Sequence, residues 1–451
     1  MTTPDKSSQS SSDAFATKVR AVLDEWAALH SPPRITVAFS GGLDSTVLLA
    51  TLCRLRLPIP LRAAHVDHGL NPLSADWSAH CARAAQALGV ELAGARVAVD
   101  RASGEGLEAA AREARYGALR ELLLPGEWLL TAHHADDQLE TVLLRIARGT
   151  GVRGLRGIVA FGPFAPGWLC RPLLNFTREQ LRAEAEAAQL VWLEDPSNAE
   201  PHHDRNYLRL HVLPALRARW PAAAQHAERL AEQAGDAEQL LEAVARDDAR
   251  ALLEPWYVPR ATLAGLEPAR QRNLLRHLLR VVGLDVPSAS KLAELRRALL
   301  ESHAESHAHV RWPGGEGRIH REALHLGAPL PEPSPPGYSA RIDASRTWAG
   351  PEGRLALSPA REGSGLPQSW LDEGLTVRFR SGGERFHPRG RDHHHSLKHL
   401  FQEEGVVPWG EANQSPFMLA RLFDASRRAK VGAGDGDRTR DIELGKLAFY
   451  R

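Results

Sequence analysis

The fold of the first half of the chain is decided by residues 35–45, which read ITVAF followed by SGGLDS. The β-branched apolar run predicts a buried strand, and Leu48, Leu49 and Leu52 have the spacing of a helix that begins directly after the glycines. Glycines allow a backbone to turn tightly and to approach a ligand closely. The N–H groups of such a loop, at the start of a helix, attract anions. We therefore predict a phosphate-binding loop made of Ser40, Gly41, Gly42, Leu43, Asp44 and Ser45.

Asp44 gives this loop its chemical character. A carboxylate beside bare phosphate is unfavourable, whereas a carboxylate that holds Mg²⁺ against phosphate oxygens is favourable. The loop contains neither GxxxxGK[ST] nor GxGxxG, so that it is not a Walker-A loop or a dinucleotide-binding loop. An ordinary strand-to-helix turn capped by serine is the simpler alternative. We predict Asp44 as a catalytic residue and as a Mg²⁺ ligand.

Strand and helix signals alternate on from this loop. Apolar β-type runs at residues 61–66, 91–97 and 128–132 are separated by helical spacing at residues 73–88, 107–124 and 139–146. Such repeats predict the α/β class, with a doubly wound parallel sheet covered by helices on both faces. Ligands of these sheets bind beyond the carboxyl ends of the strands. A helical domain, where the strand signal disappears, and a small α+β domain are predicted to follow.

Composition excludes several classes of protein. The chain has 451 residues with 43% hydrophobic and 25% charged residues, and a formal net charge of +1, so that it is a globular protein and not a polycation. Its three cysteines, Cys53, Cys81 and Cys170, form no CxxC pair, which argues against a disulfide framework, a zinc ribbon or an iron–sulfur cluster. No apolar run approaches the roughly 18–20 residues of a membrane span. We expect a soluble, cytoplasmic protein without a membrane partner.

A second cluster of polar side chains follows the strand candidate at residues 128–132 and reads TAHHADDQLET. On a helix, His133 and Asp137 are four residues apart and Asp137 and Glu140 three apart, so that they share a face. The apolar stripe that begins at Leu139 is expected to face the sheet. Acidic capping of the helix by Asp136 and Asp137 is the alternative, but it leaves His133 and His134 unexplained. We predict His133, Asp136, Asp137 and Glu140 as catalytic residues that bind metal, deprotonate an amine or hold an ammonium group.

A third motif reads EDPSN from Glu194 and continues to RNYLR from Arg205. Arg205 and Arg209 are four residues apart and could contact one phosphate together. Ion pairs of these arginines with Glu194 and Asp195 are the alternative. Taken alone, the motif does not decide between the two.

Together, SGGLDST, AHHADDQLETVLLRIARGTGVRGLRGI and EDPSN…RNYLR resemble the tRNA(Ile)-lysidine synthetases, a family of N-type ATP pyrophosphatases. Residues 65–70 (HVDHGL), 111–116 (AREARY) and 171–174 (RPLL) match as well. The resemblance runs through residues 34–215 and resumes at residues 380–384 (RSGGE) and 397–409. It implies the PP-loop ATPase fold for the first of these segments.

The resemblance also implies a reaction. ATP adenylates the C2 oxygen of the wobble cytidine in an isoleucine tRNA with the anticodon CAU, and pyrophosphate leaves. The ε-amine of free L-lysine then attacks C2, displaces AMP and leaves lysidine. The chain would be a ligase that forms a carbon–nitrogen bond, with ATP and Mg²⁺ as cofactors and tRNA(Ile) and lysine as partners.

The same resemblance implies roles for the candidate residues. The loop at residues 40–45 would hold ATP, with Mg²⁺ on Asp44. The lysine amine, with an ordinary pKa of about 10.4, must lose a proton. His133 or Asp137 is the predicted base, while Asp136 or Glu140 holds the partner of the base or the ammonium group. The predicted substrate-binding residues are Arg112, Arg115, Arg205, Arg209, Arg380, Arg385 and Lys398.

These signals divide the chain into five segments. They are a disordered leader (1–20), the catalytic domain (21–218), a helical tRNA-binding domain (219–327), a proline-rich linker and connecting segment (328–369) and a C-terminal tRNA-binding domain (370–451). Basic residues beside Phe379 and Phe386 suit an RNA backbone in the last domain. The tail from about residue 424 is polar and unlike the apolar ending typical of the family. A homodimer is compatible with the sequence.

Two other functions would use part of these motifs. A tRNA thiolase of the same superfamily would need a cysteine pair or cluster, whereas Cys53 is predicted mid-helix and the other two cysteines lie in no reactive motif. A non-catalytic protein that binds nucleotide or tRNA would keep the glycine loop but would have no use for the four side chains of the second cluster. Both alternatives are therefore less well supported than lysidine synthesis.

Overall fold

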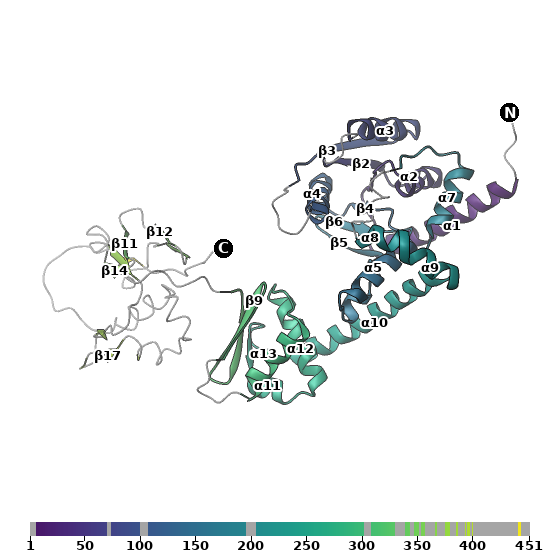
Figure 1. The fold of residues 1–451 in the computed structure, drawn as a ribbon. Coiled ribbons are helices and arrows are strands. Elements are labelled where there is room, and N and C mark those ends of the chain that lie inside the picture. The colour runs from purple at the N-terminus through teal and green to yellow at the C-terminus, as the bar shows by residue number, and fades with distance from the viewer. Residues whose placement is uncertain are drawn as a thin grey trace. The chain divides into compact units, whose positions relative to one another are not determined.

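The computed structural model describes residues 6–69, 74–99, 107–194, 204–301 and 308–329, together with short segments between residues 339 and 442 (Figure 1). The chain forms two compact units, Met1–Leu241 and Glu242–Arg451, and the division falls within helix α10 (Ala223–Ala249). In the described residues, no helix is both long and apolar enough to cross a membrane.

A six-stranded sheet forms the centre of the first unit, in the order β3-β2-β1-β4-β6-β5. Its strands are β1 (Ile35–Ala38), β2 (Leu61–Asp67), β3 (Glu91–Arg96), β4 (Trp128–Leu130), β5 (Phe161–Phe164) and β6 (Gly167–Cys170). All neighbours are parallel except β5, which runs antiparallel to β6. Strands β2 and β3 follow one another on one side of β1, whereas β4 lies on the other side of β1. The order in which strands are added to the sheet therefore reverses between β1 and β4. The predicted doubly wound sheet is confirmed.

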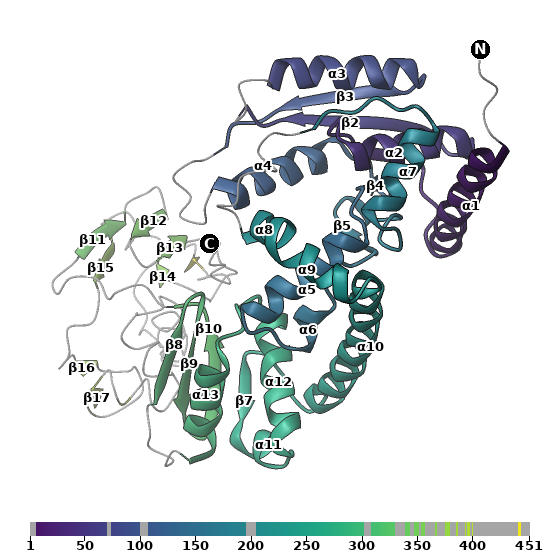
Figure 2. The ribbon, with the colours of Figure 1, turned by 45° about the vertical axis from the view of Figure 1, so that its right-hand side comes forward.

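Helices cover both faces of this sheet (Figure 2). They are α1 (Lys6–Leu29), α2 (Leu43–Leu55), α3 (Ser74–Ala87), α4 (Leu107–Leu122) and α7 (Arg178–Ala187). Trp128 and Leu130 of β4 pack into the core shared with α1, α2 and α7, whereas Leu129 packs against Leu119 and Leu123 at the end of α4. Because both faces of β4 are buried, its sequence is apolar throughout.

The leader predicted to be disordered over residues 1–20 is helical from Lys6, so this prediction is wrong for most of that segment. Phe15, Val19, Leu23 and Trp26 are spaced as one face of α1 and are buried in the core. Burial of this apolar face outweighs the serine-rich composition that suggested disorder.

Helix α5 (Ala135–Ala147) also differs from its expected packing. Its apolar residues were expected to face the sheet, but Ala135 and Leu139 pack against Leu213 of α9 (Leu213–Arg219) and the start of α10. Ile146, at the end of the stripe, is exposed. Between α5 and α9 lie α6 (Val152–Leu155), α8 (Asp204–Tyr207) and one turn of π-helix, η2 (Leu208–Val212).

A fully buried carboxylate, Glu127, joins the strand starts of β1, β2 and β4. Its oxygens accept hydrogen bonds from Nε and Nη2 of Arg34 at 2.9 Å each and from the Leu124 N–H at 2.8 Å. Thr36 donates its hydroxyl, and an Arg62 nitrogen lies 3.4 Å away. This cluster lies at the amino ends of the strands, opposite the edge where ligands of such sheets bind.

The second unit has its own core. Helices α11 (Arg260–Ala264), α12 (Pro268–Val281) and α13 (Ala289–Glu301) pack on an antiparallel sheet of order β7-β10-β9-β8. The strands are β7 (Tyr257–Pro259), β8 (His309–Trp312), β9 (Gly315–His320) and β10 (Ala323–Gly327). Helices fill most of residues 219–327 as expected, but these strands were not anticipated. Each is short, and Gly314, with φ +83°, makes the tight turn between β8 and β9.

Beyond residue 329 the structure describes short strands only. They are β11 (Ser339–Ile342), β12 (Thr347–Gly350), β13 (Gly353–Ala356), β14 (Leu366–Pro367), β15 (Leu375–Arg378), β16 (Arg385–Phe386), β17 (His395–Ser396) and β18 (Asp441–Ile442). Arg385 begins β16, which pairs with β17. Arg380, Lys398 and, apart from β18, the tail from residue 424 lie outside the described residues.

Candidate active site

The candidate site lies where the order of the strands reverses. Ile35 of β1 pairs with Trp128 of β4, so that the segments after these two parallel strands emerge side by side. The glycine loop follows β1, and the residues from Thr131 to His134 follow β4. A cavity of about 320 Å³ opens between them. This is the place where an open parallel sheet binds its ligand.

The glycine loop is held from two sides. Ser40 and Ser45 share a hydrogen bond of 3.1 Å between their hydroxyls, and Ser45 Oγ also accepts from the Ser40 N–H at 3.3 Å. From the other side, the Leu193 N–H donates to the carbonyl of Gly41 at 2.9 Å. Gly42 is the N-cap of α2. The loop therefore lies at the start of α2, where backbone N–H groups suit an anion.

Gly41 has two reasons to be glycine. Its φ is +76°, and a Cβ placed there would lie 2.9 Å from Sγ of the buried Cys81 in α3. We expect Gly41→Ala to raise the Kd for ATP at least about tenfold, because left-handed backbone costs about 1–2 kcal/mol in an L-residue and the thiol must move as well. Titration calorimetry measures this. Gly117→Ala in α4 is the control, since a Cβ there meets no atom within 4 Å; equal ATP affinity of the two variants would contradict the prediction.

Asp44 lies in the first turn of α2 and lines the cavity. Its Oδ1 is buried without a hydrogen-bond partner, and its Oδ2 lies 3.7 Å from Nε2 of His134. Burial raises the pKa of Asp44 above its usual value, and the nearby Asp137 adds to this, while His134 and two arginines oppose it. A buried carboxylate oxygen without a hydrogen-bond partner suits contact with a cation.

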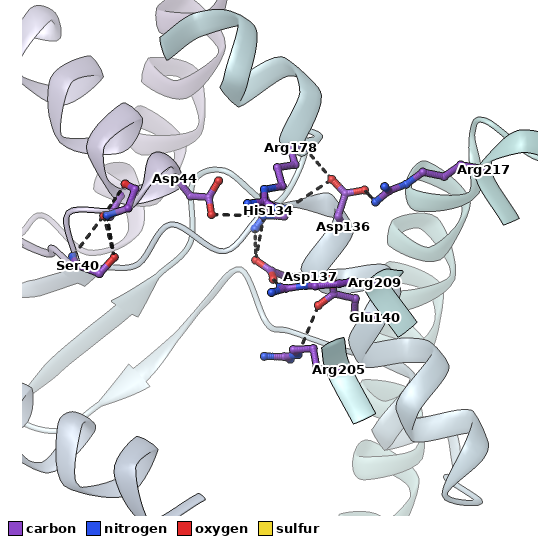
Figure 3. Close-up of polar contacts among 12 residues, drawn as sticks. Ser40, Asp44, His134, Asp136, Asp137, Glu140, Arg178, Arg205, Arg209 and Arg217 are labelled. Atoms are coloured by element: carbon purple, nitrogen blue, oxygen red, sulfur yellow. Dashed lines mark hydrogen bonds and ion pairs between the residues drawn. The ribbon is translucent and has the colours of Figure 1, made fainter. Parts of the chain in front are cut away.

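His134 is the N-cap of α5, and its ring is surrounded by carboxylates (Figure 3). Nε2 lies 3.5 Å from Asp137 and 3.7 Å from Asp44, and Nδ1 lies 3.6 Å from Asp136. The ring is almost completely buried. It therefore connects the glycine loop to the first turn of α5.

His133 is one of the residues that line the cavity. Its Nδ1 shares a hydrogen bond of 2.8 Å with the hydroxyl of Thr131. Burial lowers the pKa of His133 to about 3. Asp137 opposes this shift, while Arg171, Arg112 and Arg115 add to it. The imidazole is therefore uncharged at neutral pH.

Asp137 lines the same cavity and is ionised. Burial alone would raise its pKa, but His134, Arg209 and the hydrogen bond from the His134 N–H lower it to about 2. One oxygen accepts from Arg209 at 2.9 Å and the other from the His134 N–H at 3.1 Å. A fixed negative charge thus faces the cavity beside an uncharged histidine.

Asp136 and Glu140 are placed differently from His133 and Asp137, because neither is among the residues that line the cavity. Asp136 accepts from the backbone N–H of Arg178, at the start of α7, at 2.7 Å and from the side chain of Arg217 in α9. Glu140 accepts from Nε of Arg209 at 2.6 Å and lies 3.4 Å from Nε of Arg205. These carboxylates fix α7, α8, η2 and α9 against α5.

Three predicted arginines line the cavity, namely Arg112, Arg115 and Arg205. The guanidinium carbons of Arg112 and Arg115 lie 5.0 and 5.5 Å from the ring centre of Tyr116. Arg205 also donates to the hydroxyl of Thr141 at 3.2 Å. These arginines bring positive charge to the cavity, which suits a phosphate or a nucleotide.

Several residues of the site were not singled out from the sequence. His134 lies in the second motif, but the motif assigns it no role, because histidine is not one of the usual N-cap residues. His65 shares hydrogen bonds with the carbonyl of Phe39 at 2.9 Å and with Ser78 at 3.2 Å, and so supports the loop. Arg217 gives no local signal, since it is 81 residues from Asp136.

Comparisons with known proteins agree with this architecture. Residues 12–216 match the family model of the PP-loop domain, residues 259–325 that of the TilS substrate binding domain, and residues 375–410 that of the TilS substrate C-terminal domain. The tRNA(Ile)-lysidine synthase of Alkalilimnicola ehrlichii is 44% identical over 390 residues, which are 85% of this chain and 86% of the relative. That of Methylococcus capsulatus is 41% identical over 409 residues, 87% of this chain and 90% of the relative. That of Coxiella burnetii is 36% identical over 384 residues, 84% of this chain and 85% of the relative. The chain therefore belongs to the tRNA(Ile)-lysidine synthase family of PP-loop proteins.

Proposed function

We propose that this enzyme ligates free L-lysine to C2 of the wobble cytidine of tRNA(Ile) with the anticodon CAU. The observation that carries the proposal is the shared cavity, which the phosphate-binding Ser40 and Ser45 line together with His133 and Asp137. Adenylation of the cytidine and attack by the amine are two steps at one position of the substrate, so that the residues for both steps must lie close together. Membership of the PP-loop family implies the use of ATP.

Mg²⁺ is the metal that the residues fit. Among the described residues there is no cluster of three metal-binding side chains. Mg²⁺ commonly takes one or two carboxylates and completes its coordination with water and substrate phosphates. Asp44, with one buried oxygen that lacks a partner, would supply such a carboxylate. The ion would neutralise the phosphate charge that develops as pyrophosphate leaves.

The first half of the reaction forms a bond between the C2 oxygen of cytidine and the α-phosphorus of ATP, while pyrophosphate departs. The C2 carbonyl is urea-like and a poor electrophile, so that its oxygen must first become part of a leaving group. The loop at residues 40–45 holds the phosphates, and Arg112 and Arg115 balance the negative charge on the transferred group. We place the cytidine against these arginines and Arg205.

The second half forms the bond between the lysine ε-nitrogen and C2, and AMP leaves with the former C2 oxygen. The carboxylate of Asp137 attracts the ε-ammonium group into the cavity. The positive charges of Arg112, Arg115 and Arg205 lower the pKa of an amine bound beside them. The ammonium group loses one proton to water before it attacks. The uncharged His133 accepts the second proton, which is strongly acidic because the nitrogen becomes positively charged as the new bond forms.

We expect Asp137→Asn to separate the two halves. The amide removes the negative charge that attracts the ammonium group, so that lysine incorporation should fall at least about 100-fold, which corresponds to about 2.7 kcal/mol. The release of one equivalent of pyrophosphate per tRNA should persist. Quenched-flow assays with labelled ATP and labelled lysine measure both. Loss of pyrophosphate release, or lysine incorporation at the wild-type rate, would contradict the assignment.

The function itself is tested with purified protein, ATP, Mg²⁺, labelled lysine and an unmodified tRNA(Ile) transcript with the anticodon CAU. Elongator methionine tRNA, with the same anticodon, is the control. We expect label in the isoleucine transcript alone. Cleavage of ATP to AMP without incorporation of lysine would assign a different nucleophile, and absence of both would remove the proposed function.

Sulfur transfer, the alternative reaction, is not favoured. Cys81 and Cys170 are buried and do not line the cavity, and burial raises the pKa of Cys81 to about 12. A thiol needs an accessible thiolate to carry sulfur. We propose tRNA-binding roles for Arg209, for residues 219–327 and for residues 370–451, which include Arg380, Arg385 and Lys398. We also propose a homodimer as the form to test first by sedimentation.

A further inference from the structure

The sheet of the second unit has an outer face of unusual composition. In strands β7, β10, β9 and β8, alternate residues such as Leu324 and Ile319 are buried against the helices. The residues between them form a row of directly paired positions on the other face, made of Tyr257, His325, Arg318 and His309. The row spans three strand spacings, or about 14 Å.

Aromatic side chains gather at one end of this row. The rings of Tyr257 and His325 have centres 5.1 Å apart, and Trp256 lies 6.0 Å from His325. Trp256 is 44% exposed and Tyr257 37% exposed, although this unit has a core in which aromatic rings could be buried. Burial lowers the pKa of His325 to about 4, so that its ring is uncharged at neutral pH. Three uncharged rings at a surface offer flat faces against which a nucleobase can stack.

Arginines lie at the other end of the row, around the buried carboxylate of Glu316. Arg311 donates from Nε to Glu316 at 3.0 Å and Arg318 donates from Nε at 2.8 Å, while Nε2 of His309 lies 3.0 Å from the same carboxylate. Two arginines around one carboxylate leave a net positive charge. A guanidinium has five N–H donors, so that Arg311 can contact Glu316 and a phosphate at the same time. Arg311 is 58% exposed and in position to meet a phosphate.

We propose that this aromatic–arginine row binds an unpaired stretch of the tRNA substrate. A nucleobase stacks on the group formed by Trp256, Tyr257 and His325, and a neighbouring phosphate lies at Arg311 and Arg318. Four-stranded antiparallel sheets with helices behind and aromatic rings in front bind single-stranded RNA in this way in other proteins. A paired stretch would hide its base faces, so that the surface fits an unpaired one. The inference rests on the proposed function, which makes tRNA the substrate.

Ultraviolet crosslinking of the full-length protein to the tRNA(Ile) transcript tests the contact directly. Trypsin cuts after Arg250 and Arg260, so that Trp256 and Tyr257 lie together in one peptide, ALLEPWYVPR. We expect a nucleotide adduct on this peptide. Adducts confined to other peptides would overturn the proposal.

Affinity measurements give a second test. We expect the double variant Trp256→Ala, Tyr257→Ala to raise the Kd for the transcript about tenfold or more, because stacking on aromatic rings contributes this much per base. Tyr257→Phe should bind as the wild type does, since it keeps the ring. Leu253→Ala is the matched control, because Leu253 is 95% exposed in the same segment. Arg311→Gln should reduce the slope of log Kd against log salt by about one.

The outcomes separate this proposal from the proposed function. A wild-type protein that crosslinks through this peptide but forms no lysidine would support the surface and remove the function. A wild-type protein that forms lysidine, together with a folded double variant of unchanged tRNA affinity, would remove the surface. Altered self-association of that variant at unchanged tRNA affinity would assign the face to a protein contact and also overturn the proposal.

Discussion

Replacing Asp44 by asparagine should abolish lysidine formation, with a loss of at least about 10³-fold. The change is isosteric and keeps the start of α2, but it removes the negative charge that a divalent cation requires. Stabilisation of transferred phosphate by a metal ion amounts to several kcal/mol, and each 1.36 kcal/mol is a factor of ten in rate. Unlike Asp137→Asn, this variant should fail already at pyrophosphate release.

The measurement is single-turnover release of pyrophosphate from ATP in the presence of the tRNA(Ile) transcript. Asp24→Asn is the control, because Asp24 is an exposed acid whose ion-pair partner, Arg20, is also exposed, at 3.7 Å. Thermal unfolding should be alike for the three proteins. If Asp44→Asn released pyrophosphate at the control rate, Asp44 would have no part in adenylation.

The largest loss of stability is expected from Glu127→Gln. The carboxylate is fully buried and holds Arg34 and Arg62, whose side chains are only 25% and 10% exposed. Removal of one partner from a buried ion pair costs about 3–5 kcal/mol, since it leaves the other charge without compensation. For a unit of this size the melting temperature should fall by about 10 °C. Glu121→Gln, at an exposed position in α4, should have almost no effect.

Differential scanning calorimetry measures this loss in the transition that ATP is expected to shift upward, because the proposed ATP site lies in the first unit. The contribution of Glu127 also depends on pH. Burial would raise its pKa, but hydrogen bonds from Arg34, the Leu124 N–H and Thr36 and the charge of Arg62 lower it below the usual value. Stabilisation should therefore be complete above the unfolded pKa of about 4.3 and decline as the pH falls through the lower pKa of the folded state. A difference between wild type and variant that grew in acid would contradict this account.

Local patterns in the sequence were sufficient to predict the sheet and to identify the residues after β1 and β4 that line the cavity. The strand–glycine–helix pattern around Ser40 and the polar cluster from Thr131 are each contained in a short segment. Topology then brings their ends together, because both strands are parallel and adjacent. Asp44, His133 and Asp137 consequently line one cavity, as their positions after β1 and β4 suggested.

Long-range pairing could not be predicted in the same way. The sequence places Asp136 and Glu140 on α5 but does not say that Arg217 and Arg209 will meet them. The apolar stripe of α5 predicts that this face of the helix is buried. It does not predict whether the face packs against the sheet or, as the structure has it, against α9 and α10. The helix over Lys6–Leu29 was missed because serine-rich composition was weighed above the spacing of Phe15, Val19 and Leu23.

The burial of the cysteines has a practical consequence for spectroscopy. The chain has three thiols, and burial raises the pKa of Cys53, Cys81 and Cys170, so that each holds little thiolate at neutral pH. Maleimide reagents react with thiolates and should leave the native protein almost unlabelled. A single cysteine introduced at the exposed Leu253 would then take up a fluorophore selectively, without prior removal of the native thiols. Fluorescence measurements of tRNA binding would therefore require one introduced cysteine and no removal of the native cysteines.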